Sequence, residues 1–152
     1  MAGFRPNLAI NYSQDFSLAI RFSRVQRYAA VCSEYYFDFT CRILHSKGEF
    51  VYTGRDICFA PQTFREFAEQ LNAIRQGKAE RAEFHEIGDM IDFAIEIRGR
   101  ETRASVRIRE YQPNGEQSLL TASFRVDYDL FVNALYRMAS EFSMELASVE
   151  RA

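Results

Sequence analysis

Alternating apolar and polar residues run through most of this chain, and this pattern restricts it to a structure built mainly from β-strands. Apolar side chains occupy every second position of five segments, which are 16–22, 35–43, 91–97, 104–108 and 120–126. Successive side chains of a strand point to opposite faces of a sheet, so a period of two is typical of half-buried strands. Short links between most of these segments predict antiparallel pairing, beginning with a hairpin that turns at 46–48.

A helix follows the hairpin. Its apolar stripe has a spacing of three and four residues and consists of Phe64, Phe67, Ala68, Leu71 and Ile74. Pro61 fits the first turn of this helix, because its missing N–H needs no partner there. Alternatively, Thr63 and Glu66 form a capping box that starts the helix two residues later. Gly77 is suited to end it.

A second amphipathic helix closes the chain, capped by Asp127 or Asp129. The predicted element order is β-β-β-α-β-β-β-β-α. This order predicts an α+β fold in which an antiparallel sheet of about six strands carries the two helices packed on one face. We expect a single domain over residues 1–152, with residues 1–14 as a loose lead-in and 146–152 as a frayed tail.

Length and charge exclude several classes of protein. A chain of 152 residues can bury enough surface to fold without a metal or a disulfide. Its 19 basic and 21 acidic side chains give a net charge of −2. Nucleic-acid binding and anionic membranes both favour a concentrated basic surface, so we expect neither as a partner.

The cysteines and the N-terminus indicate a cytoplasmic protein. The three cysteines are an odd number without a Cys-x-x-Cys pair, which argues against a disulfide framework. The first ten residues lack the basic start and apolar core of a signal peptide. No apolar run approaches the length that spans a membrane.

Motifs for catalysis or cofactor binding are not apparent. His45 and His85 stand apart from any spacing typical of a metal site, and the seven glycines form no phosphate-binding loop. We therefore expect no catalytic residue, no metal and no cofactor. A Cys–His nucleophile pair stays open, because such partners meet only in space.

The densest charge feature is an acidic cluster, which consists of Glu80, Glu83, Glu86, Asp89, Asp92 and Glu96. Its last strand and the strand that follows carry opposite charges. Asp92 and Glu96 lie on the first, while the basic residues Arg98, Arg103, Arg107 and Arg109 follow around the next turn. If these strands pair, Asp92 and Glu96 lie near Arg109 and Arg103 or Arg107. Such cross-strand ion pairs contribute only about 0.2–1 kcal/mol each. The face is either a self-neutralising, solvated surface or a surface that docks a partner protein.

Tyrosines extend the candidate binding surface. Tyr36 and Tyr111 fall at strand ends or on outward faces, and tyrosine is common among the residues that dominate interfaces. The candidate partner-binding residues are therefore Arg98, Arg103, Arg107, Arg109, Asp92, Glu96, Tyr36 and Tyr111.

The middle and end of the chain resemble a bacterial family, the small single-domain immunity proteins of polymorphic toxin systems (the WapI-like family and related uncharacterised proteins). The residues that carry the resemblance are 56–59, 64–71, Gly77, 79–80, 91–97, 104–108, 124–127, Leu130, Phe131 and Leu135. The resemblance covers about residues 30–145 and contains no catalytic motif. It implies a protein that binds and blocks a cognate toxin made by the same cell.

Three functions follow for comparison. The first is a non-catalytic immunity protein, a monomer or weak homodimer, whose partner is the C-terminal toxin domain of a secreted effector. The second is a small-molecule-binding module with an apolar pocket between sheet and helix, lined by Phe37, Phe39, Phe93 and Phe124. The third is an enzyme, for which the sequence offers no constellation of residues.

Overall fold

The strands before the first helix form a sheet of their own. The computed structural model describes residues 5–12, 15–28 and 32–151. The first sheet is an antiparallel meander in the order β1-β2-β3-β4, comprising β1 (Asn7–Tyr12), β2 (Phe16–Tyr28), β3 (Cys32–His45) and β4 (Gly48–Cys58). The predicted hairpin is the β3–β4 pair, with His45 opposite Gly48.

The second sheet repeats this layout after the first helix. It runs in the order β5-β6-β7-β8, comprising β5 (Arg81–His85), β6 (Ile91–Arg98), β7 (Glu101–Tyr111) and β8 (Gln117–Val126). The α+β class is confirmed, but the single sheet of about six strands is wrong. The reason is that both sheets have one apolar face, and these two faces bury each other.

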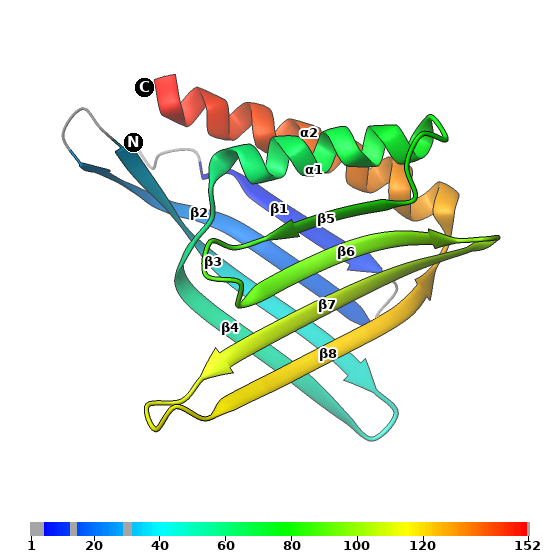
Figure 1. Ribbon diagram of the computed structural model, residues 1–152, viewed down its shortest axis with the longest axis horizontal. Helices are drawn as coiled ribbons and strands as arrows, with labels where there is room; N and C mark the ends of the chain where they lie inside the picture. Colours follow the sequence, from blue (N-terminus) through cyan, green and yellow to red (C-terminus); the bar gives the residue numbers. More distant parts are fainter. Residues whose placement is uncertain (1–4, 13–14, 29–31, 152) are drawn as a thin grey trace.

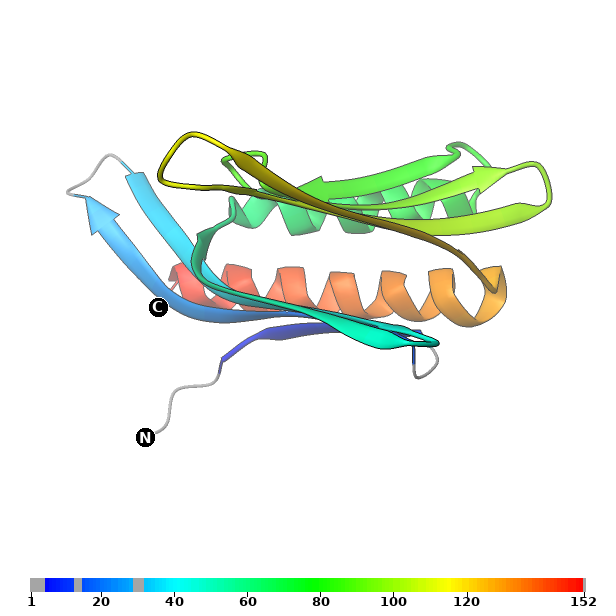
Figure 2. The ribbon, with the colours of Figure 1, turned by 90° about the horizontal axis from the view of Figure 1, so that it is seen from below.

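The helices line one side of the crossed sheets. Helix α1 (Pro61–Arg75) packs against α2 (Tyr128–Arg151), α1 also contacts β5, and α2 contacts β1. Figure 1 shows both helices above strands of the two sheets that cross each other, and Figure 2 shows the sheets as two layers. The helices therefore cover the β1 and β5 edges and do not coat one face of a single sheet.

Aromatic side chains of both sheets and both helices form one core. Phe64 of α1 lies 5.6 Å from Phe37 of the first sheet and 5.8 Å from Phe84 of the second, measured between ring centroids. Phe142 of α2 lies 4.8 Å from Phe64. Between the sheets, Phe16 and Phe93 stack at 6.4 Å. Such pairs contribute about 0.5–1.5 kcal/mol beyond the area they bury.

The predicted loose ends are partly wrong. Residues 7–12 form β1, because Leu8 and Ile10 alternate into the core and are fully buried. Residues 1–4 and 13–14 of the predicted loose lead-in lie outside the described residues. At the other end, α2 continues to Arg151, because Leu146 extends its apolar stripe and is 1% exposed.

The helix termini distinguish between the predicted alternatives. Helix α1 begins at Pro61 after Ala60 without a side-chain cap, so the capping box is wrong. The backbone N–H of Thr63 donates instead to the Ala60 carbonyl. Gly77 follows the helix with a φ of 72°, as predicted for a helix end. The Asp127 carboxylate accepts from the N–H of Leu130 and caps α2.

Neither described helix is long and apolar enough to cross a membrane. All three cysteines lie on strands of the first sheet, and the side chains of Cys41 and Cys58 are described. Cys41 is buried and Cys58 half-buried, and both are free thiols.

Candidate partner-binding surfaces

The outer surface of the second sheet, here called the charged face, carries most of the predicted binding residues. Antiparallel register places Asp92 opposite Arg107 and Glu96 opposite Arg103. Asp92 forms an ion pair with Arg107, whereas the sequence pattern placed Asp92 near Arg109. Glu96 instead pairs with Arg98 at 2.9 Å and with Arg81 of β5 at 3.1 Å.

The ion pairs continue towards β8. Glu101 accepts from Arg103 at 3.1 Å and from Arg125 at 2.7 Å. The hydrogen bond from Arg125 lowers the pKa of Glu101, and the hydrogen bond from Arg98 lowers the pKa of Glu96. These carboxylates therefore stay ionised in mildly acidic solution. Most arginines of the charged face are already paired with a carboxylate of the same chain.

Arg109 is the exception on the charged face. Among the described residues it forms no ion pair, and its buried Nε has no hydrogen-bond partner. Arg109 lies opposite Leu119 of β8, and both point outwards. Tyr111 follows two residues later with 56% of its surface exposed. Arg109, Tyr111 and Leu119 thus form a mixed aromatic, cationic and apolar group at one end of the sheet.

Tyr36 lies apart from the other predicted residues. It belongs to β3 on the first sheet, where its hydroxyl donates to Glu34 and this hydrogen bond raises its pKa. The Arg24 guanidinium covers its ring at 4.1 Å and pairs with Asp56. The structure therefore places the seven residues predicted on the second sheet along one face, from Arg98 at one end of β7 to Tyr111 at the other, and separates Tyr36 from them.

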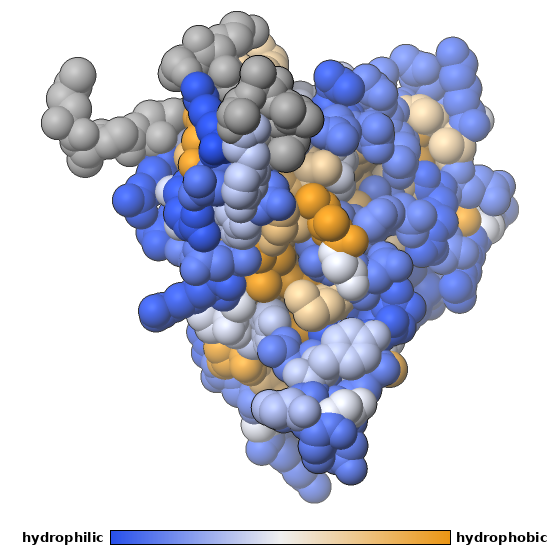
Figure 3. All heavy atoms as spheres, turned by 60° about the vertical axis from the view of Figure 1, so that its left-hand side comes forward, coloured by the Kyte–Doolittle hydropathy of each residue, from blue (hydrophilic) through white to orange (hydrophobic). Residues whose placement is uncertain are grey.

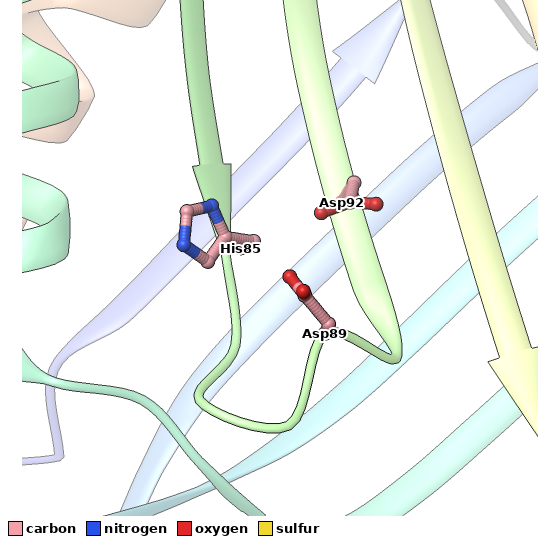
Figure 4. Close-up of side chains that lie close together, drawn as sticks. All are labelled: His85, Asp89 and Asp92. Atoms are coloured by element: carbon pink, nitrogen blue, oxygen red, sulfur yellow. The ribbon is translucent and has the colours of Figure 1, made fainter.

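A shallow hollow of about 410 Å³ opens near the middle of the charged face. It exists because small side chains, Ala94 and Ser105, face each other across β6 and β7. His85, Asp89 and Asp92 converge beside it, with ligand atoms within 4.8 Å of one another. Figure 4 shows their side chains, from the end of β5, the following loop and β6, gathered close together.

The loop that carries Asp89 is held by a buried carboxylate. Glu86 is only 2% exposed, and it accepts from the backbone N–H of Gly88 at 2.6 Å and from that of Met90. Imidazole and carboxylate groups are metal ligands, so this trio could accept a divalent cation, which the sequence spacing did not indicate. Arg107 already occupies one Asp92 oxygen, and a cation would have to compete with it.

A larger depression is a groove of about 710 Å³ along β8, here called the β8 groove. Both sheets contribute to it. Its walls are formed by Tyr12, Asp15, Phe16, Ile43, Leu44, His45, Phe50 and residues 119–125. Phe16 and Phe124 meet there at 4.6 Å between centroids. The core-facing side chains of β8 remain half-exposed at this groove, whereas those of β6 and β7 are buried.

The prediction of an apolar pocket between sheet and helix is wrong about where the pocket lies. Phe37, Phe39 and Phe93 are completely buried, because aromatic side chains of both sheets and both helices pack around them. Of the predicted lining residues, only Phe124 reaches a depression, and that depression is the β8 groove between the sheets.

The sequence contained a weak signal for this groove. Phe50–Val51 and Leu119–Leu120 are apolar doublets in strands, so one side chain of each has to face outwards. Phe50 is 53% exposed and Leu119 is 57% exposed.

The face seen in Figure 3 is mainly hydrophilic with a small central group of apolar side chains, an arrangement common on monomers.

Comparison with known proteins identifies one family. The model of the immunity protein WapI-like family matches residues 9–149 of the chain. No curated protein and no solved structure matches it. The match extends from β1 to the last turns of α2 and therefore includes both sheets and both helices.

Proposed function

We propose that this chain, which belongs to the immunity protein WapI-like family, binds and neutralises a cognate toxin domain without catalysis. The observation that carries this proposal is the extent of the match, 9–149, which includes every element of the fold. The toxin is the C-terminal domain of a secreted effector, and the complex forms in the cytoplasm of the producing cell. The free protein is a monomer or a weak homodimer.

The chemistry of the described side chains favours a binding role. A nucleophilic cysteine needs a lowered pKa, yet burial raises the pKa of Cys41 to about 11. Burial also raises the pKa of Cys58. His85 is exposed beside two carboxylates, of which Asp92 is engaged by Arg107. These groups hold structure or charge and are poorly suited to attack a substrate.

The test is protection of cells from the cognate toxin. The toxin domain is first identified by capture with the native chain and mass spectrometry, and is then expressed under an inducible promoter. Co-expression of the chain should restore growth, and the purified proteins should form a 1:1 complex. A toxin domain that remains fully active with excess chain present would overturn the proposal.

A second candidate function is supported by one observation. The β8 groove, at about 710 Å³, lies within the usual range of small-molecule sites, about 300–1,000 Å³. An apolar ligand in this groove would contact Phe16 and Phe124. Native mass spectrometry of chain purified from its host would show a constant added mass in this case, and an unliganded mass argues against it.

A further inference from the structure

We infer that the toxin docks on the free edge of β8, where an extended segment of it adds a strand to the second sheet and fills the β8 groove. This inference rests on the proposed function and names the surface that performs it. The occupant is an extended segment with apolar side chains at alternate positions and a carboxylate near the end that meets Arg109.

β8 is an edge strand of the second sheet. β8 contains 10 residues and pairs only with β7 among the described residues. The edges β1 and β5 are covered by α2 and α1, and the Cys58 carbonyl at the end of β4 accepts from the Ile87 N–H. Backbone N–H and C=O groups on a free edge provide hydrogen bonds to an added strand.

Over residues 117–124, β8 also lacks the features by which proteins protect exposed edges. Charged side chains, proline and bulges commonly prevent unwanted pairing there. Residues 117–124 contain no charge and no proline, and the β7–β8 register is continuous from Gln117 to Val126. The other uncovered edge, β4, carries Glu49, Arg55 and Asp56 and has an irregular register with β3.

The β8 groove provides apolar contacts for the added segment. Phe16, Phe124 and Leu120 line it from the interior side, and Phe50 and Leu119 stand exposed at its rim. A strand beside β8 would place alternate side chains over this floor. Burial of such aromatic and aliphatic groups accounts for most of the binding energy in typical interfaces.

Charge favours a partner other than a second copy. Arg109 lies beside Leu119 at the rim and lacks an ion pair, whereas Arg103, Arg107 and Arg125 are neutralised within the chain. A carboxylate of the partner would form an ion pair with the guanidinium of Arg109. A second copy would bring another unpaired Arg109 to the same edge, so it does not supply the complementary charge.

The experiment compares two leucine variants of the full chain. Leu119→Glu places a carboxylate at the groove rim, and Leu130→Glu makes the same change on α2, where the side chain is 78% exposed and away from the groove. Binding to the recombinant toxin domain is measured by calorimetry. We expect Leu119→Glu to weaken binding at least about 30-fold, the effect of losing a dominant contact, and Leu130→Glu to bind like wild type.

A second readout reports on strand addition directly. Amide hydrogen exchange, followed by NMR with and without the toxin domain, should show new protection at alternate residues of 118–125. Protection on the outer side of β5 and β6 instead would assign docking to the charged face and overturn the inference. Arg109→Ala should also weaken binding by about tenfold or more, while Arg137→Ala on α2 should not.

The outcomes separate the inference from the proposed function. If wild type does not bind the toxin domain, the proposed function fails and the inference fails with it. If wild type binds and both leucine variants bind equally, only the inference fails. If light scattering shows a dimer of wild type that Leu119→Glu dissociates without affecting toxin binding, the edge pairs two copies of this chain and the inference is wrong.

Discussion

Replacing Glu86 by alanine should loosen the junction between the two sheets. Its carboxylate is buried and accepts from the N–H groups of Gly88 and Met90, which shapes the loop between β5 and β6. The next residue, Ile87, donates its N–H to the Cys58 carbonyl at 3.1 Å and so connects this loop to β4 of the first sheet. Loss of the carboxylate therefore affects the turn and the contact that depends on it.

The magnitude follows from the two hydrogen bonds. A donor left without a partner costs about 1–3 kcal/mol when it is buried, and less when water can reach it. Met90 is half-buried and Gly88 is exposed, so we expect Glu86→Ala to lower the free energy of unfolding by about 2–3 kcal/mol. Glu86→Gln keeps one acceptor oxygen and the shape of the side chain, and should cost about half as much.

The assay is urea unfolding followed by far-UV circular dichroism, since the chain contains no tryptophan. Glu66→Ala, an exposed glutamate on α1, is the control and should change stability by less than about 0.5 kcal/mol. Exchange of the Gly88 and Met90 amides should accelerate in Glu86→Ala. Wild-type stability of Glu86→Ala, or a loss in Glu66→Ala of the same size, would refute the reasoning.

Three further changes test other parts of the structure. Burial and the hydrogen bond to Glu110 raise the pKa of Tyr52 to about 12. The protonated hydroxyl therefore stabilises the fold below pH 10, and its contribution of about 1–2 kcal/mol is lost as the pH rises from 10 to 12. Tyr52→Phe should flatten that part of a curve of unfolding free energy against pH. Asp127→Ala removes the cap on Leu130 and should cost about 1 kcal/mol in chemical denaturation. Leu146→Ala should cost about 2–4 kcal/mol by the same measurement, whereas a frayed tail would show no loss.

Local patterns predicted the individual elements better than their association. The alternation of 91–97 and 104–108 fixed β6 and β7, because a period of two allows one buried face only. It could not show that strands before and after α1 belong to different sheets, since both sheets present the same alternating pattern. β1 was missed because Pro6, Asn7 and Asn11 surround only two alternating apolar residues, Leu8 and Ile10.

For the candidate site, too, local patterns predicted contacts between neighbouring strands but not contacts that depend on how the elements associate. The alternating pattern predicted that Asp92 lies across from an arginine of β7, but the partner is Arg107 and not Arg109. The recruitment of Arg81 by Glu96 could not be predicted, because it depends on β5 pairing with β6. The β8 groove depends on how two sheets cross, and no pattern within a single strand contains that information.

The distribution of charge explains why the most charged surface is a poor choice for tight docking. On the charged face, Asp92, Glu96 and Glu101 already hold arginines, and a partner that covered these pairs would have to compensate their lost hydration. Along β8, apolar side chains are half-exposed, and the edge that faces away from β7 pairs with no other strand in the described part of the chain. Covering them removes apolar area from water at about 25 cal/mol per Å² and adds hydrogen bonds without separating ion pairs. Arg109 stands where the two surfaces meet, so it can add specificity to contacts that the groove stabilises.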